Sequence, residues 1–320
     1  MNVLVTGGAG YVGSVLVSRL LAGGHQVRVL DNLLHSGSSL LSVWSDRNFE
    51  FRRGDICNSE TTKNALSNMD AVVHLAAIVG DPACARDPKM AQEVNFIATE
   101  RLLKEAEETG VERFVFASTC SNYGKMADPD TYVDEGAELQ PVSVYAETKV
   151  AVEKVMLSGN GRMCKTPLRF ATVFGVSPRM RFDLTVNEFT RDMLMKKHLV
   201  VFGEQFWRPY IHVSDVARAI EMVLSSPIEK VDKEVFNVGS TTENYQKQQL
   251  VEMIRPYATD AKVEFVHKEE DPRDYRVSFA KIKNSLGFEQ ELTVHDGIKE
   301  VAQLIELKIV PDADSESYRN

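Results

Sequence analysis

Tyr145 and Lys149 are the residues of this sequence whose types and spacing best suit proton transfer. They stand four positions apart, which would place them on one face of a helix. An ammonium beside the phenol would stabilise the phenolate and lower the tyrosine pKa from about 10 toward neutral pH. Such a tyrosine can act as a general base for an alcohol proton. An ordinary surface pair on a helix has the same spacing, so the pair alone leaves both interpretations open.

The position of this pair in the chain favours the catalytic interpretation. The pair opens a predicted helix, Ser143–Leu157, which directly follows a polar loop. It also lies beyond a predicted strand that ends beside Thr119, whose hydroxyl can donate a hydrogen bond to a substrate oxygen and orient it. We therefore predict Tyr145, Lys149 and Thr119 as the catalytic residues.

A glycine-rich turn near the N-terminus has the composition of a dinucleotide-binding site. Gly7, Gly10 and Gly13 follow a short apolar run, Asn2–Thr6, and lead into a periodic apolar segment. Glycines at this spacing allow a tight turn, a close approach of the backbone to a diphosphate, and packing of a helix on a sheet. The diphosphate would lie at the helix N-terminus, where N–H groups and the helix dipole favour negative charge.

Asp31 indicates which dinucleotide is bound. It ends the next predicted strand, Val27–Leu30, at about the distance from the glycines where a carboxylate holds the adenosine ribose. A carboxylate there accepts hydrogen bonds from the ribose hydroxyls and repels a 2′-phosphate. Positions 32–35 contain no arginine or lysine. The sequence therefore predicts NAD, rather than NADP, as the cofactor.

Alternating strands and helices must hold these residues in place. The predicted strands of the first half are Val3–Thr6, Val27–Leu30, Phe49–Arg53, Ala71–Leu75 and Arg113–Ser118. This alternation predicts an α/β fold: a doubly wound Rossmann parallel sheet with ligands at the carboxyl ends of its strands. Small or polar residues follow three of these strands, namely Gly54-Asp55-Ile56, His74-Leu75-Ala76-Ala77 and Ser118-Thr119. Asp55 either reaches the adenine edge or is an ordinary turn aspartate.

Past Phe174 the alternation loosens, which predicts a smaller α/β substrate-binding lobe interleaved with the sheet. Residues 1–170, with about 209–239, form the predicted NAD-binding domain, and residues 171–208 and 240–310 form the substrate-binding lobe. Helices are predicted at Phe182–Lys197, Gln246–Tyr257 and Thr293–Leu307. The last ten residues, 311–320, are polar and are predicted to be disordered.

Composition excludes several classes of function. A net charge of −9 argues against nucleic acid or an anionic membrane as a partner. No apolar run approaches the ~20 residues of a membrane helix, and the N-terminus lacks the basic start of a signal peptide. The four cysteines are scattered, so neither a disulfide framework nor a metal site is predicted. We expect a cytoplasmic protein.

The order of these motifs resembles one known family. Thr6-Gly7-Gly8-Ala9-Gly10-Tyr11-Val12-Gly13, Asp31-Asn32, Gly54-Asp55-Ile56, His74-Leu75-Ala76-Ala77, Ala117-Ser118-Thr119, Tyr123-Gly124 and Tyr145 with Lys149 stand in its order. Together they resemble the extended short-chain dehydrogenase/reductase family of nucleotide-sugar epimerases and dehydratases, such as the UDP-glucose 4-epimerases. The resemblance spans nearly the whole chain. It implies Tyr145 as the base, Lys149 on the nicotinamide ribose, and Thr119 at the catalytic serine/threonine position.

The resemblance also implies the binding residues and the partners. The implied NAD-binding residues are Gly7, Gly10, Tyr11, Val12, Gly13, Asp31, Asn32, Asp55, Ile56, Leu75, Ala76, Ala77, Asn95, Ser118, Tyr145, Lys149 and Val173. The implied substrate-binding residues are Val79, Gly80, Thr119, Thr172, Asn187, Arg208 and Arg273. The two arginines suit the diphosphate of a nucleoside diphosphate sugar, because a guanidinium offers a planar fork of donors. A homodimer through a four-helix bundle, formed by Lys89–Thr109 and Ser143–Leu157, is implied as well.

The chain departs from the family pattern at three places. Dehydratases of the family carry Asp-Glu after the catalytic threonine, and decarboxylating members carry a glutamate at the second of these positions; here Cys120 and Ser121 stand there. Thr172 replaces the usual asparagine after the sixth strand. Residues 171–183 resemble a bacterial polysaccharide-pathway branch that includes 4-dehydrogenases of GDP-heptose. We therefore expect an epimerase first, a 4-dehydrogenase second and a 4,6-dehydratase third, with an NAD-sensing regulatory module as the non-enzymatic alternative.

Overall fold

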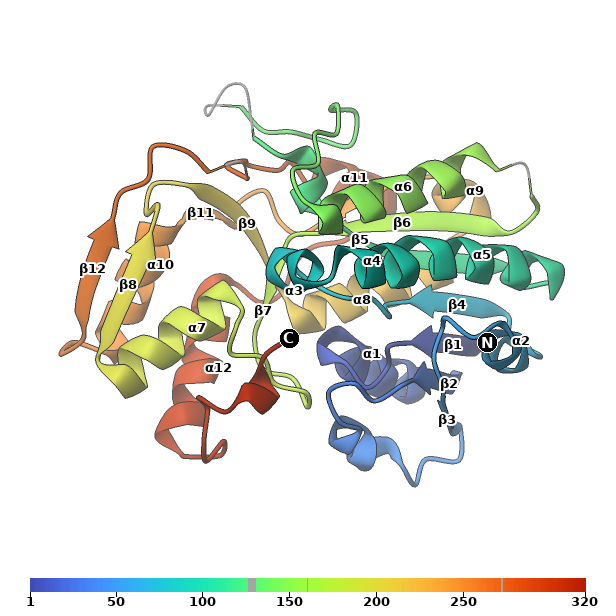
Figure 1. Cartoon of the computed structure of the whole chain (residues 1–320), viewed down its shortest axis with the longest axis horizontal. Helices are drawn as coiled ribbons and strands as arrows, with labels where there is room; N and C mark the ends of the chain where they lie inside the picture. Colours follow the sequence, from blue (N-terminus) through green and yellow to red (C-terminus); the bar gives the residue numbers. More distant parts are fainter. Residues whose placement is uncertain (126–130, 160, 272) are drawn as a thin grey trace.

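A parallel sheet lies at the centre of the computed structural model, which describes residues 1–125, 131–159, 161–271 and 273–320 (Figure 1). Within these residues the sheet has seven strands, all paired in parallel. In spatial order they are β10 (Phe236–Val238), β6 (Cys164–Phe170), β5 (Arg113–Thr119), β4 (Ala71–His74), β1 (Asn2–Thr6), β2 (Gln26–Asp31) and β3 (Phe49–Arg53). The predicted doubly wound α/β fold is confirmed.

The strand order creates a crevice at β1. The chain lays β2 and β3 on one side of β1, then returns to place β4 on the other side. The connections leaving β1 and β4 therefore go to different sides of the sheet, and ligands of doubly wound sheets bind in the gap between them. Gly7 follows β1 and Leu75 follows β4, so both predicted cofactor segments border this crevice.

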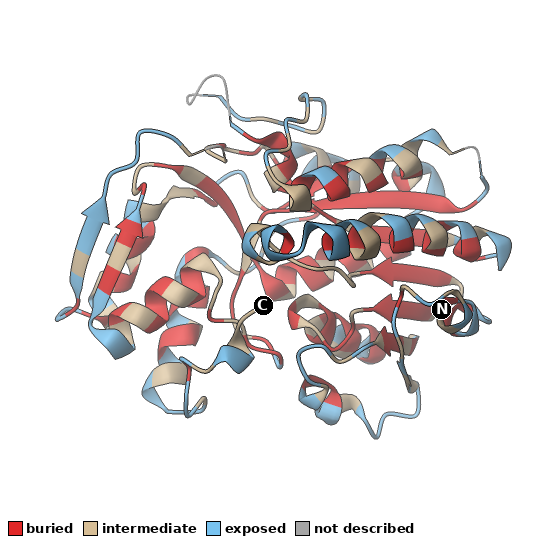
Figure 2. Ribbon diagram, viewed as in Figure 1, coloured by how far each residue is buried: buried red, intermediate tan, exposed pale blue. Residues whose placement is uncertain are grey.

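Two helical layers cover the sheet, because alternate residues of its strands face opposite sides. Val3 and Val5 of β1 pack with α1 (Tyr11–Ala22) and α8 (Val213–Ser225) in one hydrophobic core. Leu4 packs in a second core with α2 (Ser59–Leu66), α5 (Ala98–Glu108) and α6 (Val144–Ser158). Figure 2 shows the central strands buried beneath helices whose outer faces are exposed. In these described segments, every helix is too short or too polar to cross a lipid bilayer.

The predicted long helix Lys89–Thr109 is built from three pieces. A short helix, α4 (Pro88–Gln92), continues through a π-helical turn, Glu93–Ile97, into α5. A π turn adds one residue to the helical repeat and is often found at functional sites. Here it contains the buried Asn95, one of the residues implied in cofactor binding.

The second lobe contains two small sheets and three main helices. One sheet has the order β11 (Asn244–Gln246), β9 (Trp207–His212) and β7 (Thr172–Phe174), and the other pairs β12 (Lys262–Val266) with β8 (His198–Phe202). Helices α7 (Thr185–Arg191), α10 (Lys247–Ile254) and α12 (Val294–Glu306) enclose its core. The other α-helices among the described residues are α3 (Asp81–Arg86), α9 (Ile228–Val231) and α11 (Ala280–Leu286). The helix predicted from Phe182 begins only at Thr185, and it passes into a π turn at Asp192–Lys196.

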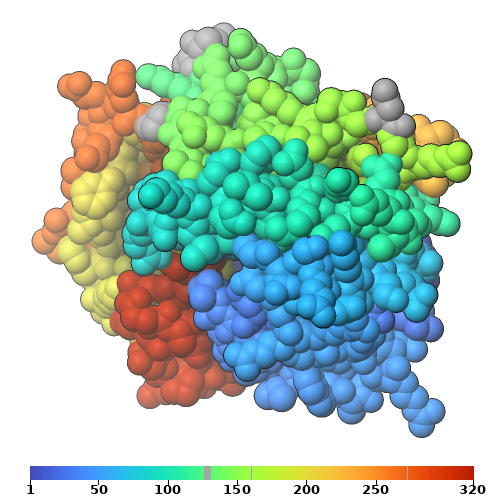
Figure 3. All heavy atoms as spheres, turned by 45° about the vertical axis from the view of Figure 1, so that its right-hand side comes forward, coloured from blue at the N-terminus to red at the C-terminus, as the bar shows by residue number. Residues whose placement is uncertain are grey.

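The last ten residues differ from the prediction of disorder, because they are packed between the two lobes. The ring of Tyr318 lies 5.6 Å from that of Phe182, and its carbonyl accepts a hydrogen bond from the Phe182 N–H at 2.9 Å. Ala313 is buried in the same cluster. In Figure 3 the red residues near the C-terminus lie beside the blue and teal residues of the first half. The sequence could not predict this packing, because a few isolated apolar residues in a polar segment form no periodic pattern.

Candidate active site

The glycine turn after β1 leaves its backbone open to a ligand. Gly7 has a φ of +73°, and a Cβ there would lie 2.7 Å from the backbone nitrogen of Ala76. A Cβ at Gly13 would overlap the carbonyl oxygen of Gly7. The first turn of α1, capped by Gly10, has backbone N–H groups without intrahelical partners, which suits a diphosphate. The tight turn and the close packing predicted for these glycines are therefore found in the structure, and their contact with a diphosphate stays a prediction.

Asp31 connects the end of β2 to this glycine turn. Its Oδ2 accepts a hydrogen bond from the Ala9 N–H at 3.0 Å, and its Oδ1 accepts one from the Leu33 N–H at 2.8 Å. Burial raises the pKa of Asp31, and the two N–H groups only partly oppose that effect. Each carboxylate oxygen has a further lone pair, so Asp31 can still accept from ribose hydroxyls. The donor and acceptor set of this corner fits NAD.

Tyr11 and Asn187 connect the two lobes rather than lining the site with their side chains. The Tyr11 hydroxyl donates to the carbonyl of Gly175 at 2.6 Å, and burial raises the pKa of this phenol. The Asn187 amide is fully buried, accepting from the Gly175 N–H at 3.0 Å and donating to the Arg181 carbonyl at 2.9 Å. Only the backbone of Tyr11 lies at the glycine turn. A substrate contact by Asn187 stays a prediction.

Lys149 lies in a dry environment beside Tyr145. Its ammonium donates to the carbonyl of Ala117 at 2.8 Å and lies 4.6 Å from the ring centre of Phe116 and 5.7 Å from that of Tyr145. Burial lowers the pKa of Lys149 from 10.5 to about 8. The structure therefore brings the tyrosine and the lysine together at the end of β5, where Thr119 is the last strand residue.

The expected lowering of the tyrosine pKa is wrong for this structure. Burial raises the pKa of the Tyr145 phenol, and the positive charge of Arg181 only partly offsets that rise. The ammonium of Lys149 donates its hydrogen bond to the Ala117 carbonyl. Proton transfer by Tyr145 therefore requires that the substrate complex stabilise the phenolate further.

A buried polar network behind these residues was not predicted. Glu153 forms a 2.7 Å ion pair with Arg169 and accepts hydrogen bonds from Asn122 at 3.0 Å and from the hydroxyl of Ser118. Ser118, implied in cofactor binding, therefore directs its hydroxyl into this network. Glu153 stands four residues after Lys149 on the same helix face, and that spacing is the one signal the sequence offered.

Asn95 holds the segment after β4. Its amide oxygen accepts from the Ile78 N–H at 2.8 Å, and its amide nitrogen donates to the Ile78 carbonyl at 3.0 Å. This pair of bonds holds the chain just before Val79 and Gly80, where φ of Gly80 is +89°. Asn95 thus positions a predicted substrate segment, and its proposed contact with the cofactor stays a prediction.

The remaining residues predicted to bind cofactor or substrate differ in how far they are exposed. Asp55 is exposed and accepts hydrogen bonds from Cys57 N–H at 2.8 Å and from the Asn32 amide at 3.2 Å, as an ordinary turn aspartate would. Ile56 is buried, and Val12, Leu75, Ala76, Ala77, Thr172 and Val173 are partly buried. Asp55 thus favours the turn interpretation.

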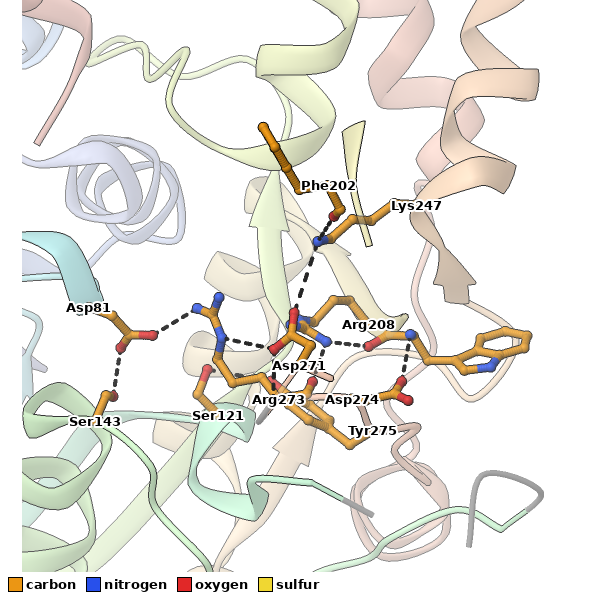
Figure 4. A network of polar contacts seen from close by, with 11 residues as sticks. Asp81, Ser121, Ser143, Phe202, Arg208, Lys247, Asp271, Arg273, Asp274 and Tyr275 are labelled. Atoms are coloured by element: carbon orange, nitrogen blue, oxygen red, sulfur yellow. Dashed lines mark hydrogen bonds and ion pairs between the residues drawn. The ribbon is translucent and has the colours of Figure 1, made fainter. Parts of the chain in front are cut away.

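Arg208 and Arg273, predicted to bind a diphosphate, meet in a cross-lobe charge cluster (Figure 4). We use that name for Asp81, Ser143, Arg208, Lys247, Asp271 and Arg273. Arg208 donates to Asp271 at 2.7 Å, and Arg273 donates to Asp81 at 2.7 Å. Asp81 also accepts a 2.6 Å hydrogen bond from Ser143, which stands two residues before Tyr145. The cluster therefore joins the second lobe to the start of α6, the helix that carries Tyr145 and Lys149.

Comparisons with known proteins agree with this arrangement. A model of the NAD dependent epimerase/dehydratase family matches residues 3–239. The chain is 30% identical over 315 residues to the dTDP-glucose 4,6-dehydratase of Streptomyces niveus, covering 95% of this chain and 92% of that protein. It is 29% identical over 316 residues to the UDP-glucuronate 4-epimerase of Thermodesulfobacterium geofontis, covering 92% of this chain and 93% of that protein.

A solved structure with bound ligands is also similar. The UDP-glucuronic acid 4-epimerase of Bacillus cereus, in complex with UDP-glucuronic acid and NAD, has a TM-score of 0.86 and 25% identity. The match covers 96% of this chain and 99% of that chain. Both lobes therefore have their counterparts in an enzyme of known fold.

Proposed function

The chain belongs to the NAD dependent epimerase/dehydratase family, and on that basis we propose that it is a nucleotide-sugar epimerase that works through a transient 4-keto sugar. NAD is its cofactor, as in the solved relatives. The observation that carries the proposal is the Tyr145–Lys149 pair, held at the end of β5 next to a nucleotide crevice. A regulatory module that only senses NAD would have no use for this pair.

Tyr145 removes the proton of the sugar hydroxyl, most simply at C4. NAD, when bound, supplies the acceptor and later the donor of the hydride. Once the proton has left Tyr145 in the substrate complex, the Lys149 ammonium, 5.7 Å from the ring centre, attracts the phenolate. Thr119 donates a hydrogen bond to the reacting oxygen and fixes its direction. An epimerase then returns the hydride to the opposite face of the keto sugar.

The residues after Thr119 favour epimerisation over dehydration. Removal of water needs an acid and a base near C5 and C6. Cys120 is buried, with its thiol directed to the carbonyl of Arg169 at 3.3 Å, and burial raises its pKa. Ser121 lies 3.4 Å from the hydroxyl of Tyr275. Neither side chain supplies a carboxylic acid or carboxylate for that step.

Release of the keto sugar is the second candidate reaction. Residues 171–183 resemble 4-dehydrogenases of GDP-heptose, and a dehydrogenase would use the same Tyr145 and Lys149 for its first step. Such an enzyme would leave stoichiometric NADH on the protein, whereas an epimerase would leave none.

A homodimer through α4, α5 and α6 is part of the proposal. Figure 3 shows the teal residues of α4 and α5 and the green residues of α6 together on one face of the molecule. Met90 in α4 and Ile97 in the π turn that follows it are exposed by 51% and 43%, and a partner helix would cover them. Sedimentation equilibrium should give twice the chain mass of 35.8 kDa. A single chain mass at micromolar concentration would exclude the dimer.

The reaction is tested with a panel of UDP-, GDP-, CDP- and dTDP-sugars. Thermal shift first identifies which sugar nucleotide stabilises the protein together with NAD. Proton NMR and absorbance of NADH then follow the product. We expect an inverted sugar without net NADH; loss of the C6 oxygen would show a dehydratase. No shift with any sugar nucleotide, beside a clear shift with NAD, would exclude the nucleotide-sugar assignment.

A further inference from the structure

Lys247 places a third cation beside the two predicted diphosphate arginines. It is the first residue of α10, and its ammonium donates to the carbonyl of Phe202, the last residue of β8, at 2.7 Å. The same ammonium lies 4.0 Å from Oδ2 of Asp271, the oxygen that accepts from Arg208 at 2.7 Å. The Lys247 side chain is only 20% exposed. A long, mobile side chain is thus held inward by a backbone carbonyl.

Asp271 lies where all three cations converge (Figure 4). Besides Arg208 and Lys247, the Nε of Arg273 lies 3.7 Å from its Oδ1, and the backbone N–H of Arg273 donates to that oxygen at 2.9 Å. Burial alone would raise the pKa of Asp271, but Arg208 and these neighbours lower it below its ordinary value. The carboxylate is therefore ionised, with 11% of its side chain exposed.

Three clustered cations are costly unless anions compensate them. Burial and the nearby Arg208 lower the pKa of Lys247, which shows that its proton is held at a cost. At 4.0 Å the Lys247 ammonium is beyond hydrogen-bond distance from Asp271, so this carboxylate balances its charge without bonding it directly. A diphosphate offers more oxygens and more negative charge than one carboxylate, and it can satisfy all three groups at once.

We propose that Lys247 is a third cationic ligand of the substrate diphosphate, beside Arg208 and Arg273, at the position that Asp271 holds in this structure. The inference rests on the proposed nucleotide-sugar function and adds a residue to that site. The two arginines bind the phosphates through planar forks, and Lys247 acts as a point charge at the α10 end. Asp271 holds the cations together and yields its place to the diphosphate.

The test measures binding of UDP, GDP, CDP and dTDP to the full chain by calorimetry. Lys247→Met should weaken the nucleoside diphosphate that binds the unaltered chain by about tenfold, the value of one charged hydrogen bond. Lys247→Arg should stay within about threefold. Lys262→Met is the matched control, because Lys262 lies in the same lobe, 74% exposed and paired with Glu264. NAD affinity and thermal unfolding should be unchanged in all three variants.

Three results would overturn the inference in distinguishable ways. If Lys247→Met binds like the unaltered chain while Arg208→Met loses affinity, the diphosphate site stands but Lys247 is not part of it. If none of the four nucleoside diphosphates binds the unaltered chain, the nucleotide-sugar function fails, and the role of Lys247 fails with it. An equal loss in Lys247→Arg and Lys247→Met would show that only local packing was disturbed.

Discussion

Two ion pairs, one inside the sheet domain and one between the two lobes, differ in their surroundings. Glu153 and Arg169 lie inside the sheet domain with side chains 2% and 5% exposed, behind Tyr145 and Lys149. Arg273 and Asp81 join the two lobes with side chains 41% and 26% exposed. The first pair is enclosed by regular elements, α6 and β6, whereas the second forms between a loop and the start of a short helix, α3.

The difference separates a permanent support from an exchangeable contact. Removing one partner of a fully buried ion pair lowers the free energy of unfolding by several kcal/mol, because the other charge is left buried without a partner. A half-exposed pair is worth about 0–1 kcal/mol, so a ligand with two phosphates can replace its anion at little cost. The Glu153–Arg169 pair is therefore a fixed support behind Tyr145 and Lys149, while the Arg273–Asp81 pair can exchange partners at lower cost.

The largest effect is expected from Tyr145→Phe. Only the proton-transfer group is removed, so turnover should fall by about 10²–10⁴-fold while the fold and NAD affinity are kept. Steady-state rates, with NAD titration and circular dichroism as controls, check this prediction. If the variant kept more than a tenth of the original activity, the base would be another residue. The contrast between a fixed catalytic region and an exchangeable cross-lobe cluster would then fail.

Removal of the buried carboxylate should mainly affect stability. Glu153→Ala leaves the Arg169 guanidinium without its buried partner, and we expect a loss of about 3–5 kcal/mol in the free energy of unfolding. Glu147→Ala is the matched control, because Glu147 is exposed on the same helix. Urea unfolding of the two variants provides the measurement. A cost below about 1 kcal/mol for Glu153→Ala would mean that this pair resembles the exposed one.

The burial of Lys149 should make the free energy of unfolding rise with pH in a defined range. Burial lowers its pKa from 10.5 to about 8, so between these values the unfolded chain binds more protons than the folded one. The cost of the buried ammonium is present in full below pH 8, and stability contributed by this group rises from pH 8 to 10.5. The advantage of Lys149→Met over the unaltered chain should thus shrink by up to about 3 kcal/mol across that window.

Urea unfolding of Lys149→Met at several pH values tests this dependence. Lys104→Met is the control, since Lys104 is 78% exposed and should give no difference between pH 7 and pH 10. A Lys149→Met difference that is constant with pH would show that the ammonium is well solvated. The assignment of Lys149 to an environment shielded from water would then be wrong.

The same contrast explains how far the sequence could predict the site. Tyr145 and Lys149 are four residues apart in one helix, and the glycines follow one strand, so local spacing places them. Arg208 and Asp271 are 63 residues apart, and Arg273 and Asp81 are 192 apart. Contacts of that kind depend on how loops and lobes pack, which no local pattern encodes. Lys247 and Asp271 were therefore missed, although Arg208 and Arg273 were reached through the family resemblance.

The smallest effect is expected from Asp271→Asn, which is also the most direct test of the cross-lobe charge cluster. If the carboxylate only holds the place of the diphosphate, its neutral isostere should no longer compete, and the nucleoside diphosphate should bind a few-fold more tightly. If the carboxylate instead orients Arg208 in the complex, the same change should weaken binding. Calorimetric titration at two salt concentrations distinguishes the outcomes, because weaker competition between charges also changes the salt dependence. Asp260→Asn is the control, since Asp260 pairs with Lys197 on the exposed surface of the same lobe. Weaker binding by Asp271→Asn would make the cross-lobe cluster as fixed as the buried network behind Tyr145, and the distinction between the two regions would no longer hold.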